Sequence, residues 1–341
     1  MPTNVNHRWL VAARPIGRAL EETDFKWDEQ PIAAPAAGEV LVRTRTLGFD
    51  PSQKAWMSNM AGYMQPVEIG GVMLGRGVGE IVESRSPDFA PGDRVRGYLG
   101  WQEYPVVQAG KLEKLPEDVP DGVALGALGS TGKTAYFGLL HVGQPRPGDV
   151  LVVSGAAGAV GSVAGQLGKL CGCTVIGVAG GAEKCGWLVD ALGFDAAIDY
   201  KTEKVGVRLR ELCPSGIDIF FDNVGGEVLE AALGLINFGA RIVICGAISN
   251  YNLDLRDPAH VPPGPRNYLN VTMKKATIEG FLNHYFTDYD STATARLTRW
   301  WREGKLTHRE DLQHGFENAP RTFMRLFEGR NFGKQVLRLA D

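Results

Sequence analysis

A strand, a turn made almost wholly of Gly and Ala, a helix and a second strand follow one another within residues 148–200. Asp149–Val153 and Thr174–Val178 are short, β-branched apolar runs of the kind that form strands buried on both faces. Between them, Ser162–Leu170 has apolar residues at helical spacing, and Gly172 follows as a C-terminal stop. This order predicts a βαβ unit, and it constrains the fold more than any other stretch.

The turn between the first strand and the helix predicts a site for a pyrophosphate. Unpaired N–H groups and the positive end of the helix dipole point there, and side chains would hold the backbone away from the phosphate. Ala156, Gly158 and Gly161 occupy the fixed positions of the dinucleotide fingerprint G-x-G-x-x-G, with Ala in place of the first Gly. Because the turn follows a strand and opens a helix, we expect it to bind a dinucleotide, with Ala159 and Val160 as part of the site. The alternative is a tight turn that serves only helix packing.

The end of the second strand indicates which dinucleotide binds. NAD sites place Asp or Glu there to accept from the ribose hydroxyls. This chain instead has Ala179, Gly180 and Gly181, followed by Lys184. Since no carboxylate is in place to repel a 2′-phosphate and a cation follows within a few residues, the sequence favours NADPH/NADP+. Taken alone, Lys184 could be a solvated lysine in the first turn of a helix.

Length, charge and cysteine content limit the classes of protein to which this chain can belong. The chain has 341 residues, which suggests two domains or one large one, and a net charge of −3 gives no reason to expect a nucleic-acid partner. It has no apolar signal core and no long apolar run, so we expect a cytoplasmic protein without membrane association. The five cysteines are odd in number, and Cys171 and Cys173 form C-x-C rather than C-x-x-C, which argues against structural zinc and a disulfide framework.

The two ends of the chain differ in pattern. Short runs broken by Pro and Gly predict a β-rich, barrel-like N-terminal domain with strands at Arg8–Ala13, Glu39–Leu47, Val78–Ser84 and Arg94–Tyr98. Beyond the βαβ unit, strands predicted at Ala196–Asp199, Ile217–Asp222, Arg241–Cys245 and Thr277–Leu282 are separated by helices at 203–212 and 226–237. This alternation predicts a doubly wound parallel sheet, which binds ligands beyond the carboxyl ends of its strands.

The last part of the chain is expected to complete the first domain. Amphipathic helices are predicted at 291–303 and 317–328, and Gly333–Leu339 is predicted to return to the N-terminal domain as a strand. We therefore expect one domain from residues 1–128 and 312–341, and a cofactor domain from 129–311.

Several separated segments resemble, in order, the medium-chain dehydrogenase/reductase superfamily. They are GEVLVR (38–43), PGDRV (91–95), GSTGKTAYFGL (129–139), AAGAVG (156–161), FFDNVGG (220–226), GARIVICGAISNYN (239–252) and GRNFGKQVL (329–337). The last four resemble the zinc-independent double-bond reductases, such as prostaglandin reductase (leukotriene 12-hydroxydehydrogenase-like) and the alkenal/one oxidoreductases. The implied fold is α/β, with a GroES-like β-barrel catalytic domain and a Rossmann doubly wound parallel-sheet cofactor domain.

The chain departs from the zinc alcohol dehydrogenases of the same superfamily. Those carry an early Cys ligand and a Gly-His-Glu segment, whereas the corresponding stretches here read GFDPSQKAW and LGRGVGEIVES. We therefore expect no zinc or other metal, and no alcohol–ketone chemistry through a metal Lewis acid.

One segment imitates a phosphate-binding loop of another class. ALGSTGKT (127–134) satisfies a relaxed P-loop pattern, but a P-loop follows a strand, and the preceding PEDVPDGVALGAL indicates a helix. The family resemblance instead implies that Lys133 and Thr134 lie near the cofactor phosphates.

The resemblance also implies further cofactor contacts. Lys184 and Tyr200 would hold the 2′-phosphate. Asn223 and the segment of Cys245, Gly246 and Ile248 would approach the nicotinamide half, and Asn331 would contact the cofactor from the returning tail. The alternatives are that Tyr200 is a half-buried tyrosine at a strand end and that Asn223 only forms a turn.

The expected chemistry follows from a nicotinamide without a metal. An α,β-unsaturated carbonyl accepts hydride at its β-carbon, and charge collects on the carbonyl oxygen as an enolate, which needs hydrogen-bond donors and a proton. Tyr251 and Tyr63 are the candidate donors, and the resemblance favours Tyr251; a tyrosine that only packs over the cofactor is the alternative. The cofactor ribose hydroxyl could also donate, and water could supply the proton. An apolar substrate pocket is expected from Tyr268, Phe281 and Tyr285.

Three functions remain open from the sequence. The first is an NADPH-dependent reductase of small-molecule enones and enals, the second a quinone reductase of the same superfamily, and the third a non-catalytic NADPH-binding protein. The resemblance further implies a homodimer formed by edge pairing of cofactor-domain strands, with Thr277–Leu282 as the candidate edge.

Overall fold

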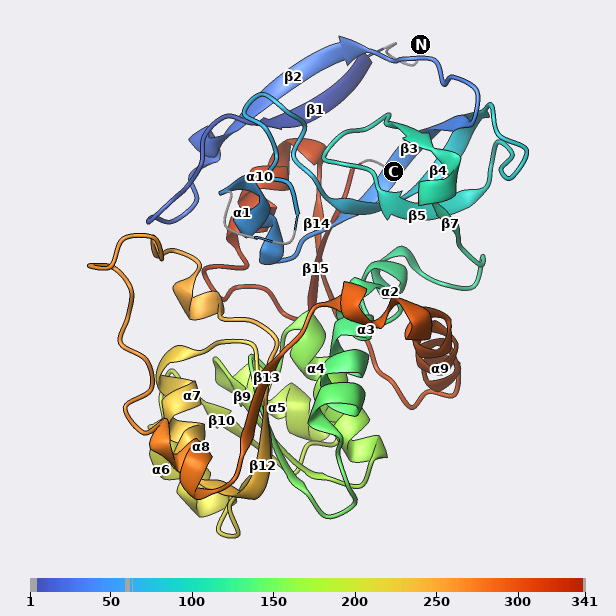
Figure 1. Cartoon of the computed structure of the whole chain (residues 1–341). Helices are drawn as coiled ribbons and strands as arrows, with labels where there is room; N and C mark the ends of the chain where they lie inside the picture. Colours follow the sequence, from blue (N-terminus) through green and yellow to red (C-terminus); the bar gives the residue numbers. More distant parts are fainter. Residues whose placement is uncertain (1–4, 59–61, 63, 340–341) are drawn as a thin grey trace. The chain divides into compact units, whose positions relative to one another are not determined.

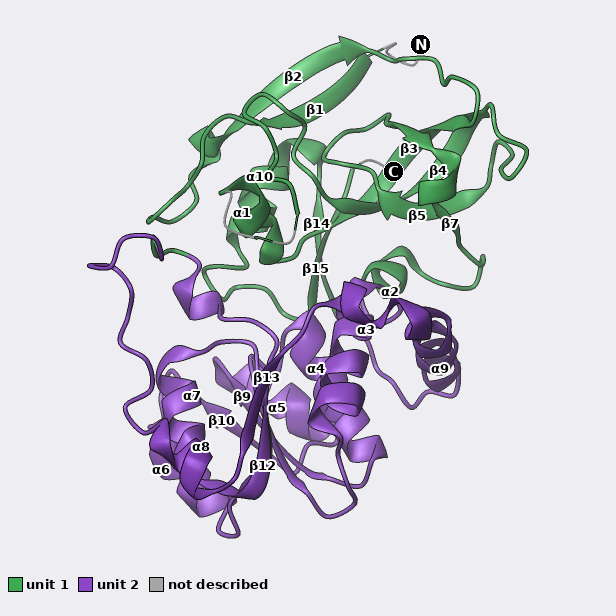
Figure 2. Ribbon diagram, in the orientation of Figure 1, with its two compact units in different colours: residues 1–125, 252–254, 310–341 green, residues 126–251, 255–309 purple. Residues whose placement is uncertain are grey.

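The chain forms two compact units in the computed structural model, which describes residues 5–58, 62 and 64–339 (Figure 1). Unit 1 comprises residues 1–125, 252–254 and 310–341, and unit 2 comprises residues 126–251 and 255–309 (Figure 2). The sequence pattern places the corresponding boundaries after residues 128 and 311, and it gives no sign that 252–254 belongs to unit 1.

Unit 2 is built on a six-stranded sheet in the order β10-β9-β8-β11-β12-β13, and every neighbouring pair is parallel. The strands are β8 Val150–Ser154, β9 Thr174–Ala179, β10 Ala196–Asp199, β11 Ile217–Asp222, β12 Ile236–Ile244 and β13 Thr277–Gly280. Numbered from β8, this is the order 3-2-1-4-5-6 of doubly wound dinucleotide-binding domains. The predicted Rossmann sheet is therefore confirmed.

Helices connect these strands (Figure 1). The helices between strands are α4 Ala159–Leu170, α5 Ala182–Asp190, α6 Val205–Leu212, α7 Gly226–Leu233 and α8 Leu269–Met273, while α3 Ser130–Tyr136 precedes β8 and α9 Asp290–Arg302 follows β13. A π-helical segment, η3 Phe137–Gly143, continues α3, and shorter 3-10 segments are η4 Ile248–Asn250 and η5 Asn283–Tyr289. The expected strand–helix alternation is thus present throughout the unit.

The helices after the glycine turn and after β11 show the larger boundary differences from the sequence prediction in unit 2. The helix after the glycine turn begins at Ala159 rather than Ser162, since the small turn residues themselves enter the helix. The helix predicted over 226–237 ends at Leu233, and β12 begins at Ile236. Ile236 is 3% exposed and pairs with Ile217, so burial in the sheet core decides its conformation against the helical pattern.

Unit 1 contains a seven-stranded sheet in the order β14-β15-β3-β4-β5-β7, with β6 also paired to β3. Its strands are β3 Glu39–Gly48, β4 Arg76–Ser84, β5 Arg94–Tyr98, β6 Val106–Gln108, β7 Glu113–Lys114, β14 Glu310–His314 and β15 Lys334–Arg338. A separate antiparallel pair joins β1 Val5–Val11 to β2 Phe25–Pro31. The helices and 3-10 turns are α1 Ser52–Met57, α2 Asp121–Leu125, α10 Ala319–Met324, η1 Glu22–Asp24, η2 Ala109–Lys111 and η6 Phe316–Asn318.

The C-terminal tail from residue 310 is part of unit 1. β15 pairs antiparallel with β3, and β14 lies parallel to β15 at the end of the sheet. The strands β2 and β14 do not follow from the pattern, because both are rich in charged and polar residues and contain no Val, Ile or Thr. The helix predicted over 317–328 is confined to α10, preceded by the turn η6.

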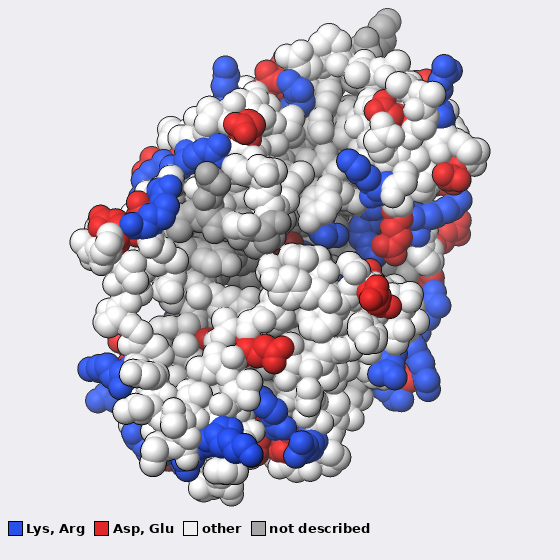
Figure 3. Space-filling view, in the orientation of Figure 1, with Lys and Arg blue, Asp and Glu red and all other residues white. Residues whose placement is uncertain are grey.

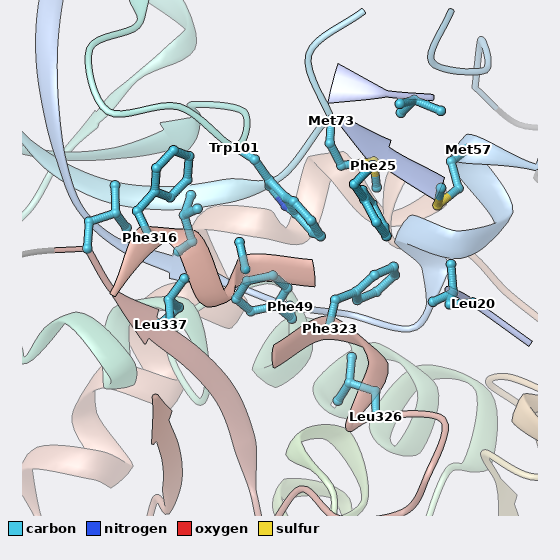
Figure 4. Close-up of a cluster of buried hydrophobic side chains, with 14 residues drawn as sticks. Leu20, Phe25, Phe49, Met57, Met73, Trp101, Phe316, Phe323, Leu326 and Leu337 are labelled. Carbon is cyan, nitrogen blue, oxygen red and sulfur yellow. The ribbon is translucent and has the colours of Figure 1, made fainter. Parts of the chain in front are cut away.

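A cluster rich in aromatic residues forms one part of the core of unit 1 (Figure 4). Trp101 is completely buried, stacks on Phe25 with ring centroids 5.1 Å apart, and meets Phe49 and Phe323 edge-on. Phe25 comes from β2 and Phe323 from α10. Packing among these rings therefore joins the start and the end of the chain, and residues after 310 are integral to the unit.

Candidate functional site

The turn predicted to hold a pyrophosphate lies between the end of β8 and the start of α4. Gly158 is the N-cap of α4 and is extended, with φ −82° and ψ 174°, and no side chain caps the helix. The Gly158 N–H donates to Gly155 O at 3.0 Å, and the Ala156 N–H donates to Val178 O at 3.0 Å. Backbone hydrogen bonds to Gly155 and Val178 thus hold the turn, and the N-terminal end of the 12-residue helix has no capping side chain.

Gly161 is required by the packing of this turn. A Cβ atom at Gly161 would lie 2.4 Å from Gly155 O and 2.8 Å from Ala156 Cα. Both neighbours are backbone atoms, which cannot rotate away. A Cβ atom at Gly158 would meet only Gly155 O, at 3.2 Å. Gly161 therefore has the helix–strand packing role of the last glycine in the fingerprint, and the turn fits a dinucleotide.

The predicted 2′-phosphate residues lie at the carboxyl ends of β9 and β10. Lys184 is in the first turn of α5, and Tyr200 directly follows β10 with its side chain 50% exposed. A Cβ atom at Gly180 would lie 2.8 Å from Tyr200 Cε1 and 2.9 Å from Lys201 Cε. The side chains of Tyr200 and Lys201 therefore lie over Gly180, which follows β9.

Lys201 is a residue that the sequence analysis did not single out. Its only sequence signal is its place next to Tyr200, and pairing of β10 with β9 brings it to Gly180. Asp199 precedes these residues, and its Oδ1 accepts from the Gly181 N–H at 2.8 Å and the Lys201 N–H at 3.0 Å. The N–H of Gly181 in particular lowers the pKa of Asp199, so this carboxylate is held by the main chain.

Asp222, at the end of β11, ties together neighbouring strand ends. It is 1% exposed, and its Oδ1 accepts from the Ser154 hydroxyl at 2.7 Å and from the N–H groups of Val224 and Gly225, both at 3.0 Å. Its main-chain oxygen accepts from the Cys245 N–H at 2.9 Å. Burial raises the pKa of the Asp222 carboxyl. The sequence analysis named Asn223 beside it but not Asp222, whose role depends on contacts between strands.

Asn223 is held by the main chain of β8. Its Nδ2 donates to Ser154 O at 2.7 Å, and its N–H donates to Ser154 Oγ at 2.8 Å. This arrangement is that of a turn-forming asparagine, and its contact with the cofactor stays a prediction. Ile248 opens η4 and donates its N–H to Asn223 O at 3.2 Å, so the segment after β12 is fixed to the segment after β11.

Cys245 and Gly246 follow β12 at the same edge of the sheet. Burial, with a smaller effect of the Asp222 charge, raises the pKa of the Cys245 thiol to about 12. The thiol is therefore protonated at pH 7, which disfavours Cys245 as a nucleophile.

Lys133 and Thr134 are engaged with other parts of unit 2. The Lys133 ammonium pairs with Asp290 at the start of α9. The Thr134 hydroxyl lies within hydrogen-bond distance of Ser130 O at 2.8 Å and Asn283 Oδ1 at 3.1 Å. The element before this segment is the helix α2, as the argument against a P-loop requires. Contacts of Lys133 and Thr134 with cofactor phosphates stay a prediction.

The remaining candidates are dispersed. Tyr251 is half-buried and directly follows η4, whereas Tyr63 lies outside the described residues. Asn331 is in unit 1, where its Nδ2 donates to Gly333 O at 3.2 Å. The expected pocket residues differ in exposure: Tyr268 and Tyr285 are each 64% exposed, and Phe281 is 8% exposed. Phe281 packs in unit 2 beside Phe286, with ring centroids 6.3 Å apart. A shared pocket stays a prediction.

The described residues contain neither a metal-binding cluster nor a membrane-spanning helix. Within residues 5–58, 62 and 64–339, no group of three or more His, Cys, Asp or Glu is arranged to hold a metal ion. The helices of the same residues include none that is long and apolar enough to cross a membrane. On the face seen in Figure 3, Lys and Arg are interspersed with Asp and Glu among wide uncharged areas.

We expect Lys184→Ala to weaken NADPH binding roughly 10- to 100-fold, because a charge-assisted hydrogen bond to a phosphate is lost. NADH has no 2′-phosphate, so its affinity should change little. Lys201→Ala should act in the same direction, and Lys169→Ala is a matched control because Lys169 pairs with Asp195 at 2.7 Å. Titration of nicotinamide fluorescence with both cofactors measures the effect. Equal losses for NADPH and NADH would remove Lys184 from the 2′-phosphate site.

Comparisons with known proteins cover nearly the whole chain. Residues 7–115 match the family described as N-terminal domain of oxidoreductase, and residues 159–298 match the family described as zinc-binding dehydrogenase. The chain is 43% identical to an NADPH-dependent curcumin reductase of Escherichia coli, covering 98% of this chain and 97% of that protein. It is 37% identical to a 2-alkenal reductase (NADP(+)-dependent) of Nicotiana tabacum, covering 100% and 99%.

A solved structure is similar over the same length. The crystal structure of CurA from Vibrio vulnificus in complex with NADPH is 40% identical, has a TM-score of 0.91, and covers 98% of this chain and 99% of that one.

Proposed function

We propose, from the premise that this chain belongs to the zinc-independent branch of the medium-chain dehydrogenase/reductase superfamily and uses NADPH, that it reduces the carbon–carbon double bond of α,β-unsaturated ketones and aldehydes. The observation that carries the proposal is full-length similarity to a curcumin reductase and a 2-alkenal reductase, both named as NADP-dependent.

The cofactor would be held by unit 2. The turn containing Gly158 and Gly161 suits a pyrophosphate, and we assign the 2′-phosphate to Lys184 in the first turn of α5 and Tyr200 after β10, which offer a cation and a hydroxyl. NADPH, when bound, supplies a hydride. The network around Asp222 fixes the main chain after β8, β11 and β12, and so presents a rigid edge of the sheet to the rest of the cofactor.

The residues of the chain must then stabilise the substrate as it changes. Hydride arrival at the β-carbon moves charge onto the carbonyl oxygen, which becomes an enolate oxygen. A neutral hydroxyl aimed at that oxygen stabilises it more in the transition state than in the ground state. We assign this role to Tyr251, since a tyrosine hydroxyl is a neutral hydrogen-bond donor.

The protonated state of Cys245 suits such a substrate. Enones and enals are electrophiles that add thiolates, and a thiol whose pKa is raised to about 12 presents almost no thiolate near neutral pH. This supports a site that handles unsaturated carbonyls without being alkylated by them.

The direct test is oxidation of NADPH, followed at the nicotinamide absorbance, with a medium-chain 2-alkenal or a 3-alken-2-one. NADH and a quinone are assayed in parallel, and the product is identified by mass. Formation of the saturated carbonyl with NADPH would establish the reaction. Turnover of the quinone alone would assign the chain to quinone reduction, and NADPH binding without any turnover would favour a binding protein.

We further propose a homodimer formed through β13. This strand ends the sheet, pairs on one side with β12, and has exposed residues throughout, with Ile278 44% exposed. An open edge of this kind is a template for pairing with another strand. Light scattering after size exclusion should therefore give twice the chain mass of 36.9 kDa. Ile278→Lys should shift the mass toward the monomer, and a monomeric wild type at micromolar concentration would contradict the proposal. The cytoplasmic location stays a prediction.

A further inference from the structure

Residues 252–254 leave unit 2 and belong to unit 1, directly after the candidate catalytic residue Tyr251. Two contacts within unit 1 hold this segment. Asn252 Oδ1 accepts from the Lys54 ammonium at 2.5 Å. A Cβ atom at Gly17 would lie 3.3 Å from Asp254 Cβ, so the backbone of Gly17 packs closely against the segment. The main chain after Tyr251 is therefore anchored by residues far away in the sequence.

Lys54 is unusual because it is a lysine in the interior. It lies on α1 and is 1% exposed. Its Nζ donates to Arg18 O at 2.7 Å as well as to Asn252, and it lies 5.5 Å from the centre of the Phe327 ring. An ammonium has three donors, so hydrogen bonds to Arg18 and Asn252 account for two of them. Burying an ammonium costs free energy of folding unless hydrogen bonds or an ion pair compensate for the lost water.

Within the part of the chain that the structure describes, no carboxylate forms an ion pair with Lys54. Asp24 is nearby and favours the charged form of the amine, but its carboxylate is engaged by the Arg18 guanidinium. Burial dominates and lowers the pKa of Lys54 to about 8. The acceptors that Lys54 reaches directly are therefore neutral, and one of them is the side chain next to Tyr251.

We propose that Lys54 is a positioning residue, which fixes the main chain after Tyr251 by holding the side chain of Asn252. The proposal rests on the function proposed above, in which the Tyr251 hydroxyl stabilises the enolate oxygen. A hydroxyl with this task must stay within a fraction of an ångström of its working position. The Lys54–Asn252 hydrogen bond restricts the conformational freedom of Asn252, the residue that follows Tyr251.

A second buried lysine provides a matched control. Lys334 is also 1% exposed and also lies in unit 1, where its Nζ contacts Phe49 O at 3.1 Å and Asp50 Oδ1 at 2.5 Å. These contacts do not involve residues 252–254. Lys54→Met and Lys334→Met each remove a buried charge, but only the first releases Asn252.

The kinetic test compares kcat for the enone, KM for the enone and the dissociation constant of NADPH. Lys54→Met should lower kcat roughly 10- to 100-fold, with NADPH affinity within about threefold of wild type, since the expected phosphate-binding turn is in unit 2. Asn252→Ala should reproduce the loss of kcat while keeping the buried Lys54 side chain in the interior of unit 1. Asn252→Asp keeps the acceptor and should restore most of kcat. Lys334→Met should lower Tm and leave kcat near wild type.

Coupling to Tyr251 separates positioning from general destabilisation. In a Tyr251→Phe background, Lys54→Met should lower kcat little further, because the hydroxyl that it positions is already absent. An undiminished loss in that background, or a loss for Lys334→Met equal to that for Lys54→Met, would overturn the proposal.

A measurement without turnover keeps this inference distinct from the proposed function. Amide hydrogen exchange of the peptide covering residues 248–256 should accelerate in Lys54→Met and Asn252→Ala but not in Lys334→Met. Unchanged exchange in Lys54→Met would contradict the anchor. If the enone is not a substrate but exchange accelerates as expected, the anchor stands and the assignment of Tyr251 fails.

Discussion

Tyr251→Phe is expected to lower kcat for enone reduction about 100- to 1,000-fold, the usual cost of removing one donor to a developing oxyanion. The substitution keeps the ring and removes only the hydroxyl. The preceding turn is held through its main chain, with the Ser249 N–H donating to Val224 O at 3.2 Å and the Ser249 hydroxyl donating to the same oxygen at 2.6 Å. We therefore expect the backbone to stay in place and the loss to fall on kcat rather than on NADPH affinity.

Single-turnover reduction of a 3-alken-2-one at saturating NADPH measures this effect on the chemical step. Tyr289→Phe is the matched control, because Tyr289 is 53% exposed and has no part in the proposed site. Tyr63→Phe, the other candidate from the sequence, is measured beside it. An unchanged rate for Tyr251→Phe would assign oxyanion stabilisation to another donor, such as the cofactor ribose hydroxyl or water.

Gly161→Ala is expected to weaken NADPH binding roughly 10- to 100-fold and to reduce the free energy of unfolding by about 1–3 kcal/mol. The new Cβ atom would lie 2.4 Å from Gly155 O and 3.0 Å from Gly155 C. Since both atoms belong to the backbone of the turn, the start of α4 must move away from the end of β8. The N–H groups of the turn then no longer converge on one pyrophosphate.

Gly186→Ala provides the control for this substitution. Gly186 is in α5, and a Cβ atom there would meet only Asp190 Oδ2, at the ordinary contact distance of 3.6 Å. Because Ala favours a helix over Gly, Tm should stay the same or rise slightly. Fluorescence titration with NADPH and thermal unfolding are measured for both variants. A Gly161→Ala protein that binds NADPH like wild type would show that the turn is not the pyrophosphate site.

Local features of the sequence were sufficient for the architecture of unit 2. Alternation of short apolar runs with helical patterns predicted a parallel sheet, and β8, α4 and β9 lie where the glycine turn required them. The replacement of an acid by Gly180 and Gly181 indicated NADPH, in agreement with the cofactor named for the relatives. These features could be predicted because each depends on residues close together in the chain.

The tertiary structure alone decided which distant residues meet. Lys201 is brought over Gly180 by the pairing of β10 with β9, and Asp222 joins the ends of strands whose sequences are far apart. Lys54 and Asn252 are 198 residues apart, and no periodicity connects them. A hydrogen-bonded lysine in the interior has the same sequence signature as a solvated one, because its partner is supplied by the fold rather than by its neighbours in the chain. The sequence by itself thus determined the cofactor fold and the family, and the packing of unit 1 determined how the segment after Tyr251 is held.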